Sequence, residues 1–203
     1  MDLLIATGNR GKAREFRELL GRDHLTWRDL SEFRPELADV PETGLSFRAN
    51  ACLKAIGYAR QANLWTLADD SGLEVDALSG NPGIYSARWA AIRKTGSGDA
   101  DNNATLLRQL ESTPDERRSA RFVCVLALAN PEGRVILTVR DSVEGRILRA
   151  PRGENGFGYD PLFWIEAMGR TTAELAPAQK HEISHRGKAL RRLRQLMERA
   201  GVE

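Results

Sequence analysis

Two adjacent carboxylates close a short apolar segment of the chain. Asp69 and Asp70 follow residues 65–68, a run that predicts a β-strand, and Ser71-Gly72 comes next. Because neighbouring side chains of an extended chain point to opposite sides, we expect the two acids to have separate roles. One can hold a divalent cation or take a proton from water, while the other ties down backbone. The alternative is a solvated turn that begins with two acids.

The first turn of the chain has the residue types of a phosphate site. A strand over residues 2–6 and a following helix are joined through Thr7-Gly8-Asn9-Arg10-Gly11-Lys12. Amide N–H groups at the positive end of a helix attract phosphate, and Lys12 adds a full positive charge. The spacing matches neither a Walker A loop nor a dinucleotide-binding fingerprint. An ordinary strand–helix turn capped by Asn9 is the alternative.

A glycine-rich segment offers a surface for a flat ligand. Its sequence is Gly153-Glu154-Asn155-Gly156-Phe157-Gly158-Tyr159-Asp160-Pro161. Three glycines around Phe157 let the backbone approach a ligand, and the aromatic ring gives a base a face on which to stack. The alternative is a hairpin loop whose aromatic side chains pack in the core.

Residues 181–185 match HExxH, the zinc-peptidase helix motif. A zinc site of this kind needs one helix through His181 and His185 and a third ligand. Gly187 weakens such a helix, and Ser184 has the residue type of a helix cap. We therefore disfavour zinc, and expect His185 and Arg186, at the start of the last helix, to contact a ligand.

The elements that position these segments follow from the apolar periodicity. The sequence predicts a helix after residue 9, a loop over 31–44, a helix over about 45–62, a strand over 65–68, a helix over 102–110, strands over 121–129, 134–139 and 142–148, a loop over 150–161 and a C-terminal amphipathic helix. Helices and strands alternate, but the hairpin around Asn130-Pro131-Glu132-Gly133 adds antiparallel pairing. The predicted fold class is therefore α/β with a mixed sheet.

Composition narrows the classes of protein further. The chain has 203 residues, of which 29% are charged, and a formal net charge of +2, so we expect a folded domain that binds neither nucleic acid nor membrane. The longest apolar run, residues 122–129, is far shorter than the roughly 20 residues that span a bilayer. Cys52 and Cys124 form no CxxC pattern, which favours a reduced, cytoplasmic protein.

Together these segments supply phosphate donors, cation-holding acids, a stacking aromatic ring and polar groups that can read a base. This combination indicates a nucleoside polyphosphate bound with magnesium. Two other classes stay open at this point: a zinc peptidase, and a nucleotide-binding or nucleic-acid-binding module without catalysis. For nucleic acid, the near-neutral net charge is an argument against.

Six blocks, in one order from residue 3 to residue 190, resemble the inosine/xanthosine triphosphate pyrophosphatase family. They are Thr7-Gly8-Asn9 with Lys12; Glu42-Thr43-Gly44 with Phe47, Asn50-Ala51 and Lys54-Ala55; Ala68-Asp69-Asp70-Ser71-Gly72-Leu73; Pro82-Gly83-Ile84-Tyr85-Ser86-Ala87-Arg88; Gly156-Phe157-Gly158-Tyr159-Asp160-Pro161; and Ser184-His185-Arg186-Gly187. Enzymes of this family hydrolyse non-standard purine nucleoside triphosphates to monophosphate and pyrophosphate. A pyrophosphatase for other modified nucleotides is the neighbouring alternative.

The resemblance implies a fold and a set of partners. The expected fold is one domain over residues 1–203, an elongated mixed β-sheet with flanking helices that form two lobes around a central cleft. The expected substrates are ITP, dITP and XTP, the expected cofactor is Mg²⁺, and the expected assembly is a homodimer. Water would attack the α-phosphorus, with pyrophosphate leaving as its magnesium complex.

The resemblance also implies roles for individual residues. The turn Thr7, Gly8, Asn9, Arg10, Gly11 and Lys12 would hold the phosphates, assisted by Asn50 and Lys54. Glu42 and Asp70 would hold magnesium, Asp70 would also be the general base, Asp69 would support it, and Ser71 would contact substrate. Phe157 would stack on the purine, Gly158, Tyr159 and Asp160 would shape its pocket, and Lys180, His185 and Arg186 would meet the base.

Base selection has a physical basis in this scheme. Hypoxanthine and xanthine carry a 6-oxo acceptor where adenine carries an amino donor, so donors from His185 and Arg186 would face a donor in ATP. A buried polar site can reject such a mismatch by roughly 10⁴-fold. Guanine shares the 6-oxo group, and the sequence does not indicate which residue rejects GTP.

Overall fold

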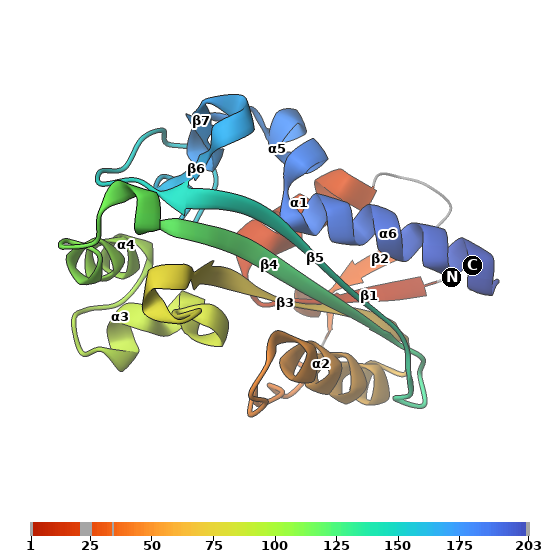
Figure 1. Ribbon diagram of the computed structural model, residues 1–203. Helices are drawn as coiled ribbons and strands as arrows, with labels where there is room; N and C mark the ends of the chain where they lie inside the picture. Colours follow the sequence, from red (N-terminus) through yellow and green to blue (C-terminus); the bar gives the residue numbers. More distant parts are fainter. Residues whose placement is uncertain (1, 21–25, 34, 202–203) are drawn as a thin grey trace. The chain divides into compact units, whose positions relative to one another are not determined.

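A mixed seven-stranded sheet forms the framework of the computed structural model, which describes residues 2–20, 26–33 and 35–201 (Figure 1). The strands are β1 (Asp2–Ala6), β2 (Thr26–Asp29), β3 (Trp65–Val75), β4 (Ser119–Ala129), β5 (Val135–Ile147), β6 (Phe163–Ile165) and β7 (Arg170–Thr171). Their order in the sheet is β2-β1-β3-β4-β5-β6-β7. β1 pairs in parallel with β2 and β3, whereas β5–β6 and β6–β7 are antiparallel, so the predicted α/β class with a mixed sheet is confirmed.

The helices are α1 (Arg10–Leu20), α2 (Phe47–Ala62), α3 (Trp89–Ile92), α4 (Asp99–Gln109), α5 (Pro177–Ile183) and α6 (His185–Ala200). The chain divides into two compact units. The first contains the described residues of 1–70, 124–141 and 186–203, and the second contains residues 71–123 and 142–185. The strands β3, β4 and β5 each contribute residues to both units. No helix in the described part of the chain is long and apolar enough to cross a membrane.

The core of the first unit has helices on both faces of the strands. Leu3 and Ile5 of β1 alternate toward a cluster that also contains Phe16 of α1 and residues of α6, among them Leu190 and Leu193. On the other face lies α2, whose fully buried Ala51, Ala55 and Ala59 recur at the spacing of one helix face (Figure 1). Small side chains on α2 let the helix lie close to the strands. The first unit therefore presents two distinct helical layers to β3.

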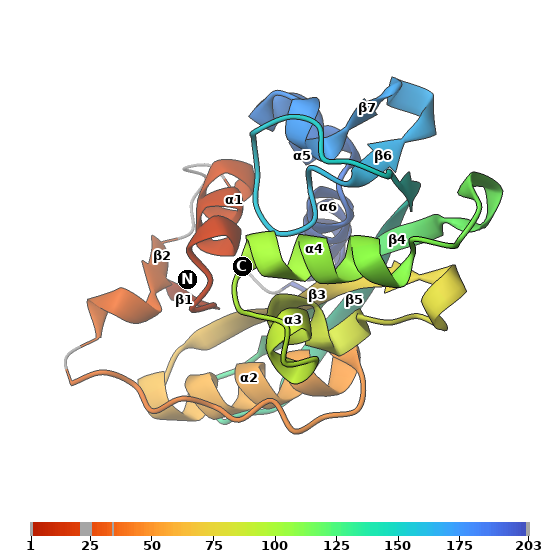
Figure 2. The same ribbon diagram turned by 90° about the vertical axis from the view of Figure 1, so that its left-hand side faces the viewer.

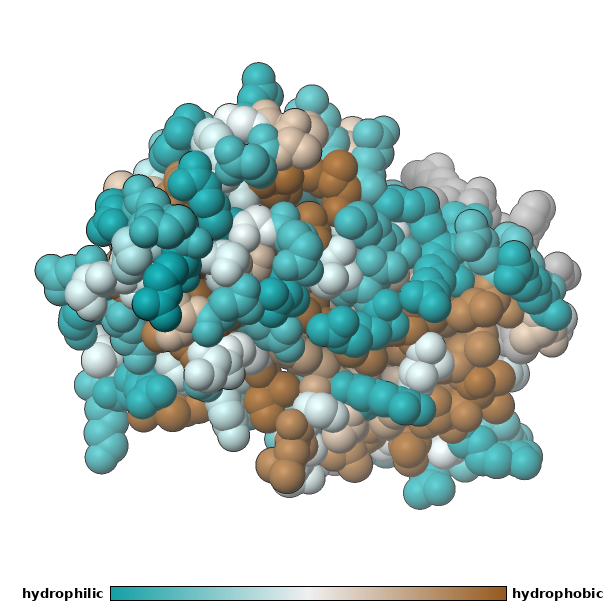
Figure 3. Space-filling view, viewed as in Figure 1, coloured by the Kyte–Doolittle hydropathy of each residue, from teal (hydrophilic) through white to brown (hydrophobic). Residues whose placement is uncertain are grey.

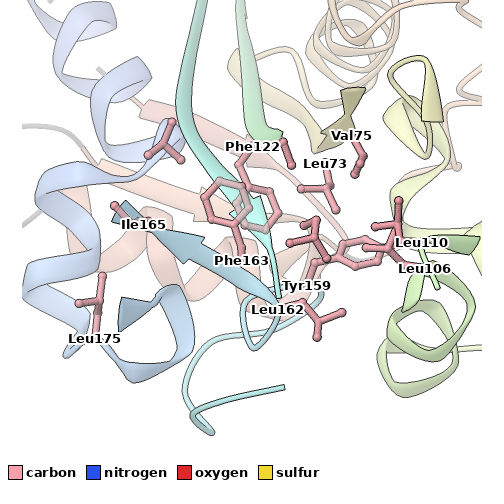
Figure 4. Close-up of a cluster of buried hydrophobic side chains, with 13 residues drawn as sticks. Leu73, Val75, Leu106, Leu110, Phe122, Tyr159, Leu162, Phe163, Ile165 and Leu175 are labelled. Atoms are coloured by element: carbon pink, nitrogen blue, oxygen red, sulfur yellow. The ribbon is translucent and has the colours of Figure 1, made fainter. Parts of the chain in front are cut away.

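The core of the second unit contains side chains from the C-terminal part of β3, the N-terminal part of β4 and from β6. Leu73 of β3, Phe122 of β4 and Phe163 of β6 pack with Leu106 of α4 (Figure 4). Tyr159, from the glycine-rich segment, is 3% exposed and belongs to this cluster. The alternative in which the aromatic side chains of that segment enter the core is thus correct for Tyr159.

Several predicted boundaries were wrong. The strand predicted over residues 65–68 continues to Val75, so the two acids lie within a strand rather than at its end. Gly72 is no turn residue there: a Cβ at this position would collide with Ser86 and with the Gly83 carbonyl, so glycine permits a close approach. The helix predicted from residue 45 begins at Phe47, because the Ser46 side chain accepts a hydrogen bond from the Ala49 amide at 3.2 Å and caps it.

Two further elements differ from expectation. The strands predicted over 134–139 and 142–148 are one strand, β5, because the charged pair Arg140-Asp141 is accommodated at sheet positions that are not buried. The helix predicted over 102–110 begins three residues earlier, at Asp99. The expected strand over 2–6, the loop over 150–161 and the C-terminal helix are confirmed, whereas β2, α3, α5, β6 and β7 were not predicted.

The face of the molecule drawn in Figure 3 is largely hydrophilic, with smaller apolar areas between the hydrophilic residues. Among the residues that the structure describes, the large apolar side chains that are exposed come from several elements and connecting segments. They are Leu45 (92% exposed), Leu53, Tyr85, Ile92, Ile136 and Met168.

Candidate functional site

The β1–α1 turn is a capped helix start. Asn9 Oδ1 accepts a hydrogen bond from the Lys12 amide at 3.0 Å, and the Asn9 amide donates to Thr7 Oγ1 at 3.2 Å. Asn9 is therefore the cap that the alternative interpretation foresaw. The cap uses only one amide of the first turn, and those of Arg10 and Gly11 have no carbonyl partner within an α-helix. The turn therefore keeps its capacity to bind an anion, with Gly8, Asn9 and Arg10 exposed.

Asp69 is held by cations from two helices. Its Oδ1 lies 2.9 Å from Lys12 Nζ of α1, and its Oδ2 lies 3.3 Å from Arg186 Nη2 of α6. The Cys124 thiol lies 3.9 Å from the same Oδ2. Burial alone would raise the pKa of Asp69, but Lys12, Arg186 and Lys54 hold that pKa well below its ordinary value. Asp69 is therefore a fixed anion.

Arg186 is the centre of a buried ion-pair network. Its side chain is almost fully buried, and its guanidinium bonds both Asp69 and the carboxylate of Glu15. Glu15 is 5% exposed, although a glutamate side chain is ordinarily solvated. Glu15 follows Lys12 by three residues, which puts both on one side of the helix, but only the tertiary structure identifies Arg186 as its partner. The predicted contact of Arg186 with a base stays a prediction.

Asp70 faces α2, which lies on the other side of β3 from α1 and α6. Lys54 Nζ of α2 lies 3.8 Å from Asp70 Oδ1 and 2.7 Å from Glu42 Oε1. Burial raises the pKa of Asp70 to about 6, an effect that Lys54 and Lys12 only partly offset. The pKa of Lys54 is raised because Asp69, Asp70 and Glu42 outweigh its burial, so the ammonium stays charged.

The donor set around Asp70 fits a hard cation. Glu42 and Asp70 supply carboxylate oxygens, and Lys54 already places one positive charge beside both. Asp70 Oδ2 is buried and has no hydrogen-bond partner among the residues that the structure describes. Within the same residues, no three His, Cys, Asp or Glu side chains converge as a complete metal-binding group. Mg²⁺ suits this arrangement because it takes few protein ligands and keeps water and phosphate oxygens.

Asn50 orders the segment that carries Glu42. It is fully buried on α2, and its Oδ1 accepts a hydrogen bond from the Gly44 amide at 2.8 Å. A Cβ at Gly44 would collide with Ala49 and Asn50, so glycine is required for this approach. Asn50 therefore fixes the backbone two residues after Glu42, and its expected contact with phosphate stays a prediction.

In the second unit, Asp160 links the residues predicted to surround a base. Asp160 Oδ2 accepts hydrogen bonds from the Phe157 amide at 2.9 Å and from Lys180 Nζ at 2.6 Å. Lys180 Nζ lies 5.1 Å from the centre of the Phe157 ring. Thr172 Oγ1 donates to Asp160 Oδ1 at 2.8 Å, which fixes the carboxylate. Phe157 itself is only half-buried, unlike Tyr159.

Tyr159 and Gly158 are each held by residues to which the sequence analysis assigned no role. The Tyr159 hydroxyl donates to the Ser86 carbonyl at 2.9 Å, and burial raises the pKa of this phenol, so it stays protonated. Gly158 bonds Asp99 and Asn103 of α4 through its backbone. No local sequence pattern indicates these contacts, because they join segments 55 to 73 residues apart.

The HExxH match does not form a zinc motif. α5 ends at Ile183, Ser184 has an extended conformation with ψ 153°, and α6 begins at His185. His181 and His185 therefore do not lie on one helix, which the motif requires. The His185 ring instead stacks on Phe122, with 5.0 Å between the ring centres.

The structure thus gathers the predicted residues into two clusters. The first unit contains the β1–α1 turn with Lys12, and also Glu42, Asn50, Lys54, Asp69, Asp70 and Arg186. The second unit contains Phe157, Gly158, Tyr159, Asp160, Lys180 and His185, with Ser71 half-buried at its start. Glu15, Ser86, Asp99, Asn103 and Thr172 are additions from the structure.

Comparison with known proteins agrees with the six sequence blocks. The sequence profile of the Ham1 family matches residues 3–196. A dITP/XTP pyrophosphatase of Geobacillus kaustophilus is 50% identical over 192 residues, which are 95% of this chain and 92% of that protein. A dITP/XTP pyrophosphatase of Pseudomonas syringae pv. tomato is 50% identical over 194 residues, 95% of each chain.

Solved structures give the same result. A HAM1 protein from Coxiella burnetii is similar with a TM-score of 0.86 and 40% sequence identity, and the match covers 98% of this chain and 99% of that one. The Staphylococcus aureus Ham1 protein has a TM-score of 0.84 at 40% identity, with 98% of each chain covered. The family resemblance predicted from the sequence is confirmed: this chain belongs to the Ham1 family.

Proposed function

We propose that the protein hydrolyses non-standard purine nucleoside triphosphates, namely ITP, dITP and XTP, to the nucleoside monophosphate and pyrophosphate. The observation that carries this proposal is that the two adjacent carboxylates of β3 have different surroundings. Asp69 is bound by Lys12 and Arg186, while Asp70 keeps a buried oxygen without a partner in the described part of the chain. The names of the relatives, dITP/XTP pyrophosphatases at 50% identity, support the same substrate class.

Positive charge for the phosphates comes from the start of α1 and from two lysines. The amides of Arg10 and Gly11 lie at the positive end of the helix dipole, beside Lys12 and with Thr7, Gly8 and Asn9 in the turn before them. Lys54 adds a second ammonium. Hydrolysis of a phosphoanhydride puts negative charge on phosphate oxygens, so positioned cations contribute most of the catalysis.

Glu42 and Asp70 would hold Mg²⁺, which would offset the charge of the triphosphate so that a carboxylate can approach it. Asp70 is also the proton acceptor for the attacking water. Asp69 cannot serve as well, because its two oxygens already bind Lys12 and Arg186. We assign the attack to the α-phosphorus, with pyrophosphate as the leaving group, and Ser71 beside Asp70 as a further substrate contact.

The purine is assigned to the cluster around Phe157. The half-buried ring offers a face for stacking, while Tyr159 and Asp160 fix the loop that carries it. Lys180 and His185 are the donors proposed to face the 6-oxo group of hypoxanthine or xanthine. Adenine has an amino donor at that position, so ATP would leave donors facing each other and is rejected.

The test of this function is a panel of substrates with Mg²⁺: ITP, dITP, XTP, GTP and ATP. We expect kcat/KM for ITP, dITP and XTP to exceed that for ATP by roughly 10⁴-fold, the range that a mismatched buried hydrogen bond allows. Equal turnover of ATP would refute the proposal. A zinc peptidase is not favoured, since the two histidines of the motif lie on different helices.

Two further assignments belong to this proposal. We assign the enzyme to the cytoplasm, where its substrates are found; Cys52 and Cys124 are unpaired thiols, as in a reducing compartment. We also propose a homodimer, as in the family that the sequence resembles. Sedimentation equilibrium at micromolar concentration tests the dimer, and a mass of one chain would refute it.

A further inference from the structure

The loop that carries Phe157 is anchored to α4 through the next residue. The Gly158 amide donates to Asp99 Oδ2 at 2.7 Å, and Asn103 Nδ2 donates to the Gly158 carbonyl at 3.0 Å. Gly158 has no side chain, so these two bonds fix it through both of its backbone groups. Figure 2 shows the segment that follows β5 reaching α4.

The two anchoring side chains are suited to this task. Asp99 and Asn103 are four residues apart on α4, which places them on one face of the helix. Asp99 is the first residue of the helix, where the helix dipole stabilises its carboxylate, and its bond to the amide is charge-assisted. Gly158 has φ +63°, a left-handed conformation that glycine adopts without strain.

Helix α4 connects this loop to the hydrophobic core of the second unit. Leu106 on the same helix and Leu110, directly after its last residue, are fully buried among the side chains of the second core cluster. Trp89 Nε1 donates to Gln109 at 2.9 Å and joins the C-terminal turn of α4 to α3. Gly158 is thus tied to a packed helix rather than to another loop.

Phe157 is held from both sides by these contacts. Its own amide bonds Asp160 Oδ2 at 2.9 Å, and the following residue, Gly158, is fixed by α4. Asp160 is tied in turn by Thr172 and Lys180. The backbone that carries the aromatic ring is therefore bonded within its own loop at Phe157 and to α4 at Gly158.

We propose that Asp99 and Asn103 are positioning residues that set the Phe157 ring for the purine and thereby determine the choice among 6-oxo purines. This inference rests on the proposed function, in which Phe157 stacks on the base. Hypoxanthine and guanine differ only at the 2-position. A small displacement of the stacked ring therefore changes which of the two bases the site accommodates.

The experiment compares ITP and GTP hydrolysis by three variants and the unchanged protein. Asn103→Ala and Asp99→Ala each remove one anchor of Gly158, while Asp99→Asn keeps an acceptor oxygen and is the conservative replacement. The matched control is Asn102→Ala. Asn102 is the neighbouring residue of the same type, but its hydrogen bonds go to other residues than those of the loop. Its side-chain Oδ1 accepts from the Ala90 amide at 2.8 Å, and its Nδ2 donates to the Ala87 carbonyl at 3.2 Å.

For Asn103→Ala and Asp99→Ala we expect KM for ITP to rise roughly two- to tenfold, as for one lost hydrogen bond, with kcat changed by less than about twofold. The ratio of kcat/KM for ITP to that for GTP falls, and Asp99→Asn restores most of it. Asn102→Ala lowers the Tm but keeps that ratio, because the contacts that it loses are with Ala90 of α3 and with Ala87, which precedes α3.

Wild-type KM and an unchanged ITP-to-GTP ratio in both alanine variants would overturn the inference. Asp99 is exposed, so its variant gives a result even if Asn103→Ala fails to fold. A fall in the ratio for Asn102→Ala equal to that for Asn103→Ala would also overturn it, since general loosening would then explain the effect. Failure of the unchanged protein to hydrolyse ITP would instead refute the proposed function itself.

Discussion

Asp69 and Asp70 are consecutive in β3, yet they pair with opposite layers of the first unit. Asp69 meets Lys12 of α1 and Arg186 of α6, whereas Asp70 meets Lys54 of α2. The alternation of side chains along an extended strand produces this separation. One carboxylate becomes a fixed structural anion, and the other remains available for chemistry.

Replacement of Asp70 tests the catalytic half of this arrangement. Asp70→Asn should lower kcat by roughly 10²- to 10⁴-fold, the usual contribution of a general base. The free energy of unfolding should stay equal or rise, because the carboxylate is buried with its nearest ammonium 3.8 Å away. Steady-state kinetics and urea denaturation measure the two effects. A fully active Asp70→Asn variant would place the base elsewhere.

Replacement of Asp69 tests the structural half. Asp69→Ala leaves the fully buried Arg186 with one carboxylate partner fewer, and should lower the free energy of unfolding by about 3–5 kcal/mol. Arg17→Ala is the control, because the Arg17–Asp29 pair is solvent-exposed on the arginine side and should contribute less than about 1 kcal/mol. Equal destabilisation by the two variants, measured in urea, would contradict the account.

The sequence indicated candidate residues for the site, but not which of them contact one another. The alternation of Asp69 and Asp70 follows from local geometry alone, and the six blocks identified the family. The strand was nevertheless predicted to end at residue 68, since Ser71-Gly72 has the composition of a turn; only the close approach to Ser86 explains a glycine inside β3.

Contacts between residues far apart in the sequence could not be predicted in the same way. Glu15 has the appearance of a solvated helix residue, and Arg186, 171 positions later, makes it a buried anion. Asn103 lies 55 residues from Gly158, and Asn102, its neighbour, has a different partner. The short strands β6 and β7 were missed because two or three residues carry no periodicity.

Removal of the Phe157 ring tests recognition of the base. Phe157→Ala should raise KM for ITP by roughly 5- to 100-fold, since stacking on an aromatic ring contributes about 1–3 kcal/mol per base. The phosphate-binding residues are untouched, so kcat should change far less. Phe157→Tyr retains the ring and should keep KM near that of the unchanged protein. An unaltered KM in Phe157→Ala would assign the ring to packing.

Replacement of Glu42 tests the metal site. Glu42→Gln removes one of the two carboxylates beside Lys54, and should weaken Mg²⁺ binding roughly tenfold in isothermal titration. Glu36→Gln is the control: it removes the same charge from an exposed position of the same segment. Equal Mg²⁺ affinity in both variants would exclude Glu42 as a ligand.

In the proposed reaction water attacks the α-phosphorus, and hydrolysis of ITP in H₂¹⁸O shows directly which phosphorus is attacked. We expect inosine monophosphate that carries one ¹⁸O atom, together with unlabelled pyrophosphate, when the products are separated and analysed by mass spectrometry. Label in the pyrophosphate, or release of single phosphate ions from ITP, would contradict it.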